Sequence, residues 1–323
     1  MALAARATKA DRAAYAEAID GGELVLGPSL RAAIHAVPPD DLSLYGRTAI
    51  SADDDELGRQ LGRGAMKSLR ARAIAPTHAL AEVTEATRQT LAGGRRLDRT
   101  GLHDGLRERV RSELLPWCVG CESNHVSPML WRYAGVAAGM RMDSERRFRS
   151  GRPGRLRKGA DLARAYVRFY GPAEVKGFSA WAGLAPAQGR RLWDEIADEL
   201  EEVEWEGGRG WIAAGDRRAL DSPPQASGTR LIPPRDPYLQ QADRETLVPD
   251  AGVRKRLFRA VASPGAVLRD GALAGMWKAR AGRGDALEFE VERLAPLDRD
   301  ELERECARVA KVRGADGFEI SIA

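Results

Sequence analysis

Apolar positions recur three and four residues apart through most of residues 11–200. This spacing puts the apolar side chains on one face of a helix. Turn and capping residues mark the ends of the helices: Gly21 and Gly22 end the first one, and Ser127 and Pro128 are typical of an N-cap and a first helical residue. Helices are therefore predicted over residues 11–20, 40–50, 79–92, 99–110, 128–138, 160–170, 174–182 and 187–200.

Short polar strands follow two of the helix groups. RMDSERRFRSGRPG, residues 141–154, comes after the helices of 79–138. EEVEWEGGRGWIAA, residues 201–214, comes after the helices of 160–200 and turns at Gly207 and Gly208. Three helices and then a β-hairpin is the order of a winged helix-turn-helix unit. Because the order occurs twice, tandem winged-helix units are predicted.

The pattern changes from Asp221 onward. DSPPQASGTRLIPPRDPYL is rich in proline, and AVLRDGALAGMWKAR contains two apolar runs joined by Asp270 and Gly271, which is a strong signal for a tight hairpin. Residues 286–294 alternate like a strand, residues 298–313 have helical spacing before Gly314, and residues 317–323 end the chain as a strand. A small β-rich domain with one packed helix is predicted here.

The fold class that these patterns predict is α+β and mainly α, with winged helix-turn-helix units followed by a β-rich C-terminal domain. The expected parts are a partial first winged-helix unit at 1–78, a second unit with a basic wing at 79–157, a third unit at 158–220, and the C-terminal domain at 221–323.

Composition restricts the class of protein. The 323 residues are 43% hydrophobic, enough to bury cores, and the formal net charge is only +4 although 51 residues are Lys or Arg. A polyanionic partner must therefore be bound by local patches. No run of about 18 apolar residues occurs, so no membrane association is expected. Three cysteines do not form a disulfide framework, and a cytoplasmic location without an organic cofactor is expected.

The strongest candidate for contact with nucleic acid is the stretch RMDSERRFRSGRPGRLRKG, residues 141–159. Its glycines and Pro153 predict a flexible loop on the wing of the second unit. Cations on a wing commonly contact the phosphate backbone, although a solvated linker is the alternative. The candidate residues are Arg146, Arg147, Arg149, Arg152, Arg155, Arg157 and Lys158.

Two further cationic sites are candidates. Lys278, Arg280 and Arg283 follow Trp277 at the rim of the C-terminal hairpin, where they could contact a groove, although Trp277 could equally well belong to the core. Arg190 and Arg191 begin the helix predicted at 187–200, and every charged residue after them up to Glu206 is acidic. Only the first turn of that helix could approach phosphates, so the third unit is predicted to be mainly a scaffold.

Cys118, Cys121 and His125 have a spacing that could bind zinc. A structural zinc site needs four ligands, so His103 or Glu122 would have to complete the set, since Cys306 is far away in the sequence. The favoured alternative is a tight turn without a metal, which leads into the helix that begins at Ser127.

Several stretches together resemble one known family. RAAIHAVPPDDL, LLPWCVGCESNHVSPMLWRYAG, the unit from FYGPA to WDEI, and RLIPPRDPYLQQADRETLVPD look like the AlkZ/YcaQ-like family of bacterial winged-helix DNA glycosylases. The resemblance covers nearly the whole chain. It implies a double-stranded DNA partner, damaged or alkylated, and an activity that removes bulky alkylated bases or unhooks interstrand crosslinks without a cofactor.

One motif of that family is missing. In the family, the motif that activates water is Gln-x-Gln or Gln-x-Asp, where x is any residue. It lies just before the segment that aligns with ALAARATKAD, residues 2–11 here. No Gln-x-Gln occurs in the chain, and its one Gln-x-Asp, Gln241-Ala242-Asp243, lies far along the sequence from that segment. Two interpretations stay open: a longer form of the protein carries the motif and is active, or this member has lost the chemistry and kept the binding.

The nearest substitute for a catalytic group is His35, which stands where the family has Arg-Gly-Thr-x-His, with Ala32 and Ala33 in place of the Gly and Thr. Together with Asp40 and Asp41 it could orient water or contact a phosphate. The alternative is a structural histidine beside two capping acids. Competing functions are a DNA-binding module without activity, such as a regulator or an inactive damage binder, and a winged-helix protein that binds other proteins.

Overall fold

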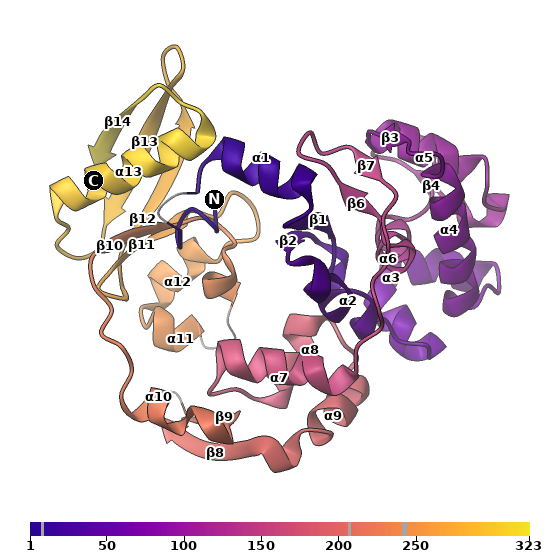
Figure 1. The fold of residues 1–323 in the computed structure, drawn as a ribbon, viewed down its shortest axis with the longest axis horizontal. Helices are drawn as coiled ribbons and strands as arrows, with labels where there is room; N and C mark the ends of the chain where they lie inside the picture. Colours follow the sequence, from indigo (N-terminus) through magenta and orange to yellow (C-terminus); the bar gives the residue numbers. More distant parts are fainter. Residues whose placement is uncertain (8–9, 206–207, 241–243) are drawn as a thin grey trace. The chain divides into compact units, whose positions relative to one another are not determined.

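The computed structural model describes residues 1–7, 10–205, 208–240 and 244–323 (Figure 1). The chain forms two compact units. Unit 1 contains Met1–Tyr15, Glu202–Gly210 and Ala214–Ala323, and unit 2 contains Ala16–Glu201 and Trp211–Ala213. The fold is mixed α+β with a β-rich C-terminal sheet, as predicted. Among the described residues, every helix is too short or too polar to cross a bilayer. The division at 78, 157 and 220 stays a prediction.

Unit 2 contains the helix groups and the β6–β7 hairpin (residues 141–149), while most of the β8–β9 hairpin (residues 200–213) belongs to unit 1. Its second group comprises α4 (Pro76–Thr90), β3 (Arg96–Leu97), α5 (Arg99–Arg107), α6 (Pro128–Ala138), β6 (Arg141–Met142) and β7 (Phe148–Arg149). The strands β6, β7 and β3 are neighbours in one sheet. β3, which lies between α4 and α5 in the sequence, pairs with β7 of the hairpin that ends this group. Three helices followed by a hairpin were predicted for this stretch, and Ser127 and Pro128 do begin α6.

The segment before this group comprises α1 (Arg12–Gly21), β1 (Val25–Pro28), β2 (Ile34–Val37), α2 (Leu42–Tyr45) and α3 (Asp54–Ala71). In this segment, the predicted helix 11–20 is confirmed, the predicted helix 40–50 is wrong in length because only Leu42–Tyr45 is α-helical, and β1, β2 and α3 were not predicted. β1 pairs with β2 and with β6, which extends the sheet to β2-β1-β6-β7-β3. The glycines in DDELGRQLGRGAMKSLRA disfavour a helix by about 1 kcal/mol each, yet Leu57, Leu61 and Leu69 are buried and stabilise α3 by packing.

α3 begins at a cap and contains an irregularity. The Asp53 carboxylate accepts a hydrogen bond from the backbone N–H of Glu56 at 2.9 Å, which satisfies a free donor of the first turn. Gly62 has φ 77° and ψ 171°, so the helix is interrupted there. A residue with a side chain would adopt this conformation only with strain, so glycine fits the position.

The third group contains α7 (Gly159–Tyr170), α8 (Val175–Ala182), α9 (Pro186–Asp194), β8 (Leu200–Trp205) and β9 (Gly208–Ala213). The predicted helix 187–200 is wrong at its end, because α9 stops at Asp194 and Leu200 begins a strand. Pairing of β8 with β9 overrides the helical propensity of this Glu-rich stretch. Leu184, Trp193 and Ile196 are buried in the core of this group. Glu206 and Gly207 lie outside the described residues.

Unit 1 is built on a five-stranded sheet in the order β10-β11-β12-β13-β14, over Thr229–Ile232, Gly265–Arg269, Ala272–Ala281, Ala286–Arg293 and Gly317–Ile322. Asp270 and Gly271 have φ 50° and 84°, so they form the predicted tight turn between β11 and β12. α13 (Arg299–Arg313) ends at Gly314 with φ 74° and packs on the sheet. The short helices α10 (Arg217–Asp221), α11 (Arg244–Leu247) and α12 (Ala251–Leu257) complete the unit.

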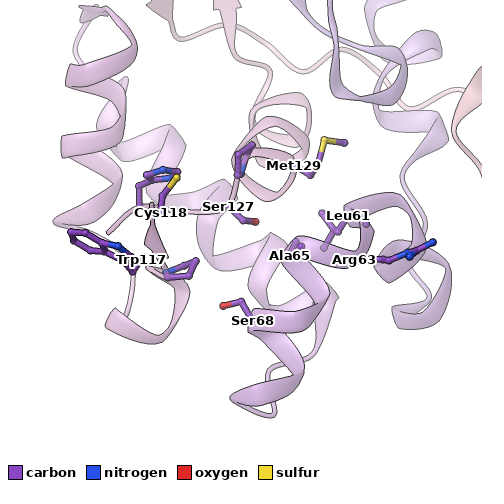
Figure 2. A pocket seen from close by; sticks show the side chains of 13 residues that line it. Leu61, Arg63, Ala65, Ser68, Trp117, Cys118, Ser127 and Met129 are labelled. Carbon is purple, nitrogen blue, oxygen red and sulfur yellow. The ribbon is translucent and has the colours of Figure 1, made fainter. Parts of the chain in front are cut away.

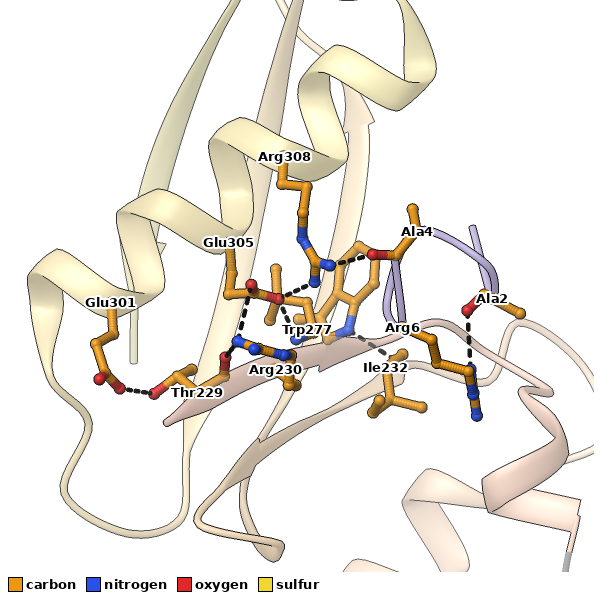
Figure 3. A network of polar contacts seen from close by, with 11 residues as sticks. Ala2, Ala4, Arg6, Thr229, Arg230, Ile232, Trp277, Glu301, Glu305 and Arg308 are labelled. Atoms are coloured by element: carbon orange, nitrogen blue, oxygen red, sulfur yellow. Dashed lines mark hydrogen bonds and ion pairs between the residues drawn. The ribbon is translucent and has the colours of Figure 1, made fainter. Parts of the chain in front are cut away.

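A buried carboxylate links α13 to the sheet. Glu305 is 7% exposed and accepts hydrogen bonds from the backbone N–H of Leu231, at 3.0 Å, and from Arg308 (Figure 3). Arg308 also donates to the carbonyl of Ala4, so the N-terminal residues are held on the same network. A buried charge is tolerated only with such partners, so this network fixes the position of α13.

The stretch DPYL, residues 236–239, is part of the sequence that resembles the family, and its first residue has a structural role in unit 1. The side chain of Asp236 is fully buried and accepts two hydrogen bonds from Arg6, at 2.6 and 2.9 Å, and one from the backbone N–H of Tyr238, at 2.9 Å. A bidentate guanidinium–carboxylate pair is strong and directional. Asp236 therefore ties the start of the chain to the C-terminal domain.

Candidate nucleic-acid interface

A row of cations follows one side of α3. Arg59, Arg63, Lys67 and Arg70 are exposed. Gly62 interrupts the helix after Arg59, but all four residues line one groove, so they lie on one side of α3. Within the described residues, none of them forms an ion pair or side-chain hydrogen bond. They line a groove of about 950 Å³, with Asp54 and Asp55 at one end. We call these four residues the α3 cation row. Sequence analysis missed it, although the i, i+4 spacing of the cations could have revealed it.

The basic segment, residues 146–158, follows the β6–β7 turn of the same unit and is irregular from residue 150 onward. It is anchored through two of its carbonyls. Arg141 Nη2 donates to the carbonyl of Arg152 at 3.1 Å, and Arg47 Nη1 donates to that of Gly154 at 3.0 Å. The predicted loop therefore lies against unit 2.

The cations of this segment differ in their surroundings. Arg147 pairs with Glu145 and Arg157 pairs with Asp161, both at 3.3 Å. Arg149 is half-buried in β7. The exposed members without an ion pair in the described structure are Arg146, Arg152, Arg155 and Lys158. These four are the ones that could exchange water for phosphate without losing a partner.

The two arginines of α9 have different environments. Arg190 is exposed. Arg191 forms a bidentate pair with the buried Glu56 of α3, with N–O distances of 2.8 and 2.9 Å, and Ser51 Oγ donates to the same carboxylate at 2.7 Å. Nearby, Gln60 and Gln188 both donate to the carbonyl of Ala49. Arg191 therefore holds α9 against α3; its side chain stays exposed but is paired, whereas Arg190 forms no ion pair in the described structure.

Replacing Arg191 by methionine should lower the stability of unit 2 by about 1–2 kcal/mol at neutral pH, because the buried Glu56 carboxylate loses its charged partner. Hydrogen bonding to Arg191 lowers the pKa of Glu56, so the folded state gains from this pair above the ordinary glutamate pKa and loses the gain as the pH falls through the lowered one. Urea unfolding at several pH values measures this. A difference between wild type and R191M that grows in acid would contradict the assignment.

On the β12–β13 hairpin of the C-terminal sheet, Trp277 is buried and the three cationic candidates are exposed. Trp277 is 1% exposed, and its Nε1 donates to the carbonyl of Ile232 at 2.9 Å, so the core-packing alternative is the correct one. Arg280 pairs with Glu288 at 2.8 Å and Glu290 at 3.3 Å across the β12–β13 ladder. Lys278 and Arg283 are exposed. The contact with DNA predicted for this hairpin stays a prediction for Lys278 and Arg283.

His35 lies in β2, and its Nδ1 is 2.8 Å from Ser29 Oγ. Burial, and then the charge of Arg31, lowers the pKa of His35, so its imidazole is neutral at neutral pH. The preceding turn is strained, because Arg31 and Ala32 have φ 53° and 54°. Asp40 is exposed and Asp41 half-buried in a short helical turn. No hydrogen bond between His35 and either acid is present, so their predicted cooperation is not visible in the geometry.

The three zinc candidates of the sequence come together at a hairpin between α5 and α6. β4 (Trp117–Cys118) pairs with β5 (Ser123–Asn124), and ligand atoms of Cys118, Cys121 and His125 all lie within 4.8 Å of one another. Cys118 and His125 also line a pocket of about 480 Å³. Figure 2 shows Trp117 and Cys118 on one side of this pocket and Leu61, Ala65 and Ser68 of α3 on the other.

Comparisons with known proteins give consistent results. Residues 1–312 match a family model described as DNA glycosylase AlkZ-like. An interstrand DNA cross-link repair glycosylase from Streptomyces sahachiroi is 29% identical over 170 residues, which are 50% of this chain and 44% of that protein. The match thus spans less than half of this curated relative. The solved Streptomyces sahachiroi DNA glycosylase AlkZ superposes with a TM-score of 0.71 at 20% identity, over 97% of this chain and 85% of that one, which shows a common fold.

Proposed function

This chain belongs to the AlkZ-like DNA glycosylase family, and from that premise we propose that it binds duplex DNA that carries bulky alkylated bases or interstrand crosslinks. The observation that carries the proposal is the α3 cation row. Four exposed cations on one side of α3, without ion pairs in the part of the chain that the structure describes, retain their full charge for a polyanion. The relative from Streptomyces, whose name includes cross-link repair, supports the choice of lesion.

The free cations of the basic segment lie in the same unit and are further candidates for phosphate contact. Each phosphate that a cation neutralises releases condensed counterions, so affinity should fall steeply with salt. Contacts of this kind are to the backbone and do not read sequence. Recognition of a damaged site would then depend on how easily the duplex deforms at the lesion.

The reaction that we propose is hydrolysis of the N-glycosidic bond of the damaged purine, with His35 as the group that orients water. The neutral imidazole has one nitrogen beside Ser29 Oγ, which leaves the other for a water molecule. Burial lowers the pKa of His35 and therefore weakens it as a base. Orientation of water, and not strong proton abstraction, is the role that fits this environment.

A second candidate function is binding without base release. One observation favours it: the chain contains no Gln-x-Gln, and its one Gln-x-Asp, Gln241-Ala242-Asp243, lies far along the sequence from the segment that the family's motif precedes. A binder of this kind would use the same cationic surface and would hold the lesion without hydrolysing it.

Base release and binding can be measured on the same DNA. The full chain is incubated with a duplex that carries a bulky N7-alkylated guanine, and the freed base is quantified by mass spectrometry. Glycosylase activity predicts release by the wild type and a loss of about 100-fold or more in His35→Ala with unchanged duplex affinity. Tight binding without release supports the second candidate. Failure to bind the duplex even at low salt would sink the proposal.

A further inference from the structure

The hairpin between α5 and α6 has the geometry of a metal-binding turn. The backbone N–H of Cys121 donates to the carbonyl of Cys118 at 3.3 Å, and Glu122 has φ 47°, so the chain reverses tightly between β4 and β5. This turn brings the two thiols to the same side, together with the ring of His125. Ligands on a tetrahedral zinc ion are about 3.4–3.8 Å apart when Zn–S is about 2.3 Å and Zn–N about 2.0–2.1 Å. From 4.8 Å or less, side-chain rotation closes the remaining gap.

His125 is oriented as metal-binding histidines usually are. The ring is 5% exposed, and Nδ1–H donates to the backbone carbonyl of Val126 at 2.8 Å. That hydrogen bond fixes the tautomer in which Nε2 carries a lone pair. Nε2 is buried and has no hydrogen-bond partner. A buried imidazole nitrogen without a partner is unfavourable, and a bound cation would remove that penalty.

A second histidine, His103, lies beside His125 and also has buried ring nitrogens without a hydrogen-bond partner. The ring of His103, in α5, is 5.0 Å from the ring of His125, and both of its nitrogens are buried without a partner. His103 is outside the group of three whose ligand atoms lie within 4.8 Å, and a side-chain rotation would be needed to bring it to the same ion.

The thiols are also suited to a cation. Two thiolates would balance the charge of a divalent ion. Sulfur and imidazole ligands select zinc over magnesium and calcium, which prefer oxygen.

We propose that Cys118, Cys121 and Nε2 of His125 bind one zinc ion. His103 supplies the fourth ligand through one of its free ring nitrogens. This assignment changes the preference of the sequence analysis for a turn without metal, and it does not depend on the proposed function. The ion would join α5, through His103, to the hairpin that leads into α6. Zinc would therefore fix the connection between the two helices and one wall of the pocket that Cys118 and His125 line.

Elemental analysis of the full chain tests the site. Protein produced in zinc-supplemented medium and washed with a weak chelator should retain about one zinc per chain, because a structural site binds tightly. Cys118→Ser and His125→Ala should each lose it, and His103→Ala should weaken retention at least about tenfold. The matched controls are Cys306→Ala and His78→Ala, which remove the remaining cysteine and an exposed histidine and should keep the metal. Wild-type protein without zinc, or equal zinc in the Cys118→Ser variant, overturns the proposal.

A measurement on the unaltered protein covers the case in which a variant does not fold. Zinc should slow alkylation of Cys118 and Cys121 relative to protein stripped with a strong chelator, and cobalt should give the absorption of a tetrahedral thiolate complex. Equal alkylation with and without zinc contradicts the site, as does a Cys118–Cys121 disulfide that forms in zinc-loaded protein.

Discussion

Replacing Arg59, Arg63 and Lys67 together by alanine should weaken duplex binding roughly 10- to 100-fold near 0.2 M salt and reduce the salt slope by about 3, because each lost cation removes one phosphate contact and its counterion release. The three side chains are exposed on α3 and have no acidic partner in the described structure, so their removal costs little folding energy. Fluorescence anisotropy of a labelled duplex over a range of salt concentrations measures both quantities.

The matched control removes the same charge from unit 1. Arg293, Arg304 and Lys311 are exposed and form no ion pair among the described residues, so their triple alanine variant has the same change in net charge. Its affinity should stay within about threefold of the wild type, because the global field is screened beyond a Debye length. Equal losses in the two variants would show that net charge, and not the α3 cation row, attracts the duplex.

Trp277→Ala should destabilise unit 1 by about 3–5 kcal/mol, since it removes a large buried side chain and leaves a cavity. Trp277 stacks near Phe289, at 5.9 Å between ring centroids, and Nε1 donates to Ile232. Gly265 lies opposite it on β11, where a Cβ would collide with the indole. Chemical denaturation followed by circular dichroism gives the free energy of unfolding.

Trp117→Ala is the control for this effect, because that indole is 61% exposed and its removal should cost less than about 0.5 kcal/mol. Under conditions in which both variants are folded, Trp277→Ala should bind the duplex as the wild type does. A stable Trp277→Ala protein with weakened DNA binding would return Trp277 to the interface and contradict its place in the core.

The elements that local signals dictate were predicted from the sequence. Asp270-Gly271 has one favourable turn geometry, and Gly314 adopts the left-handed conformation that ends α13. α3 was missed because its glycines disfavour a helix and its stability comes from packing of Leu57 and Leu61, which local propensity does not contain. The end of α9 was wrong for a related reason: strand pairing of β8 with β9 decides the state of Leu200.

For the candidate site too, the sequence predicted only groupings of residues that are close along the chain. Spacing identified the Cys118, Cys121 and His125 group, because its members are close in sequence and a tight turn brings them together. Spacing could not show that Arg191 is held by Glu56, since 135 residues separate them. Nor could it show that His103 lies beside His125. Which cations are free, and which are already paired, is a property of tertiary structure.

Arginine footprinting tests the central claim that the cationic surface of unit 2 binds the DNA backbone. Phenylglyoxal modifies exposed arginines, and mass spectrometry compares its rate at each position with and without duplex. We expect the duplex to protect Arg59, Arg63 and Arg152 from phenylglyoxal and to leave the modification rates of Arg293 and Arg304 unchanged. Full reactivity of α3 and the basic segment in a saturated complex, with protection elsewhere, would contradict it.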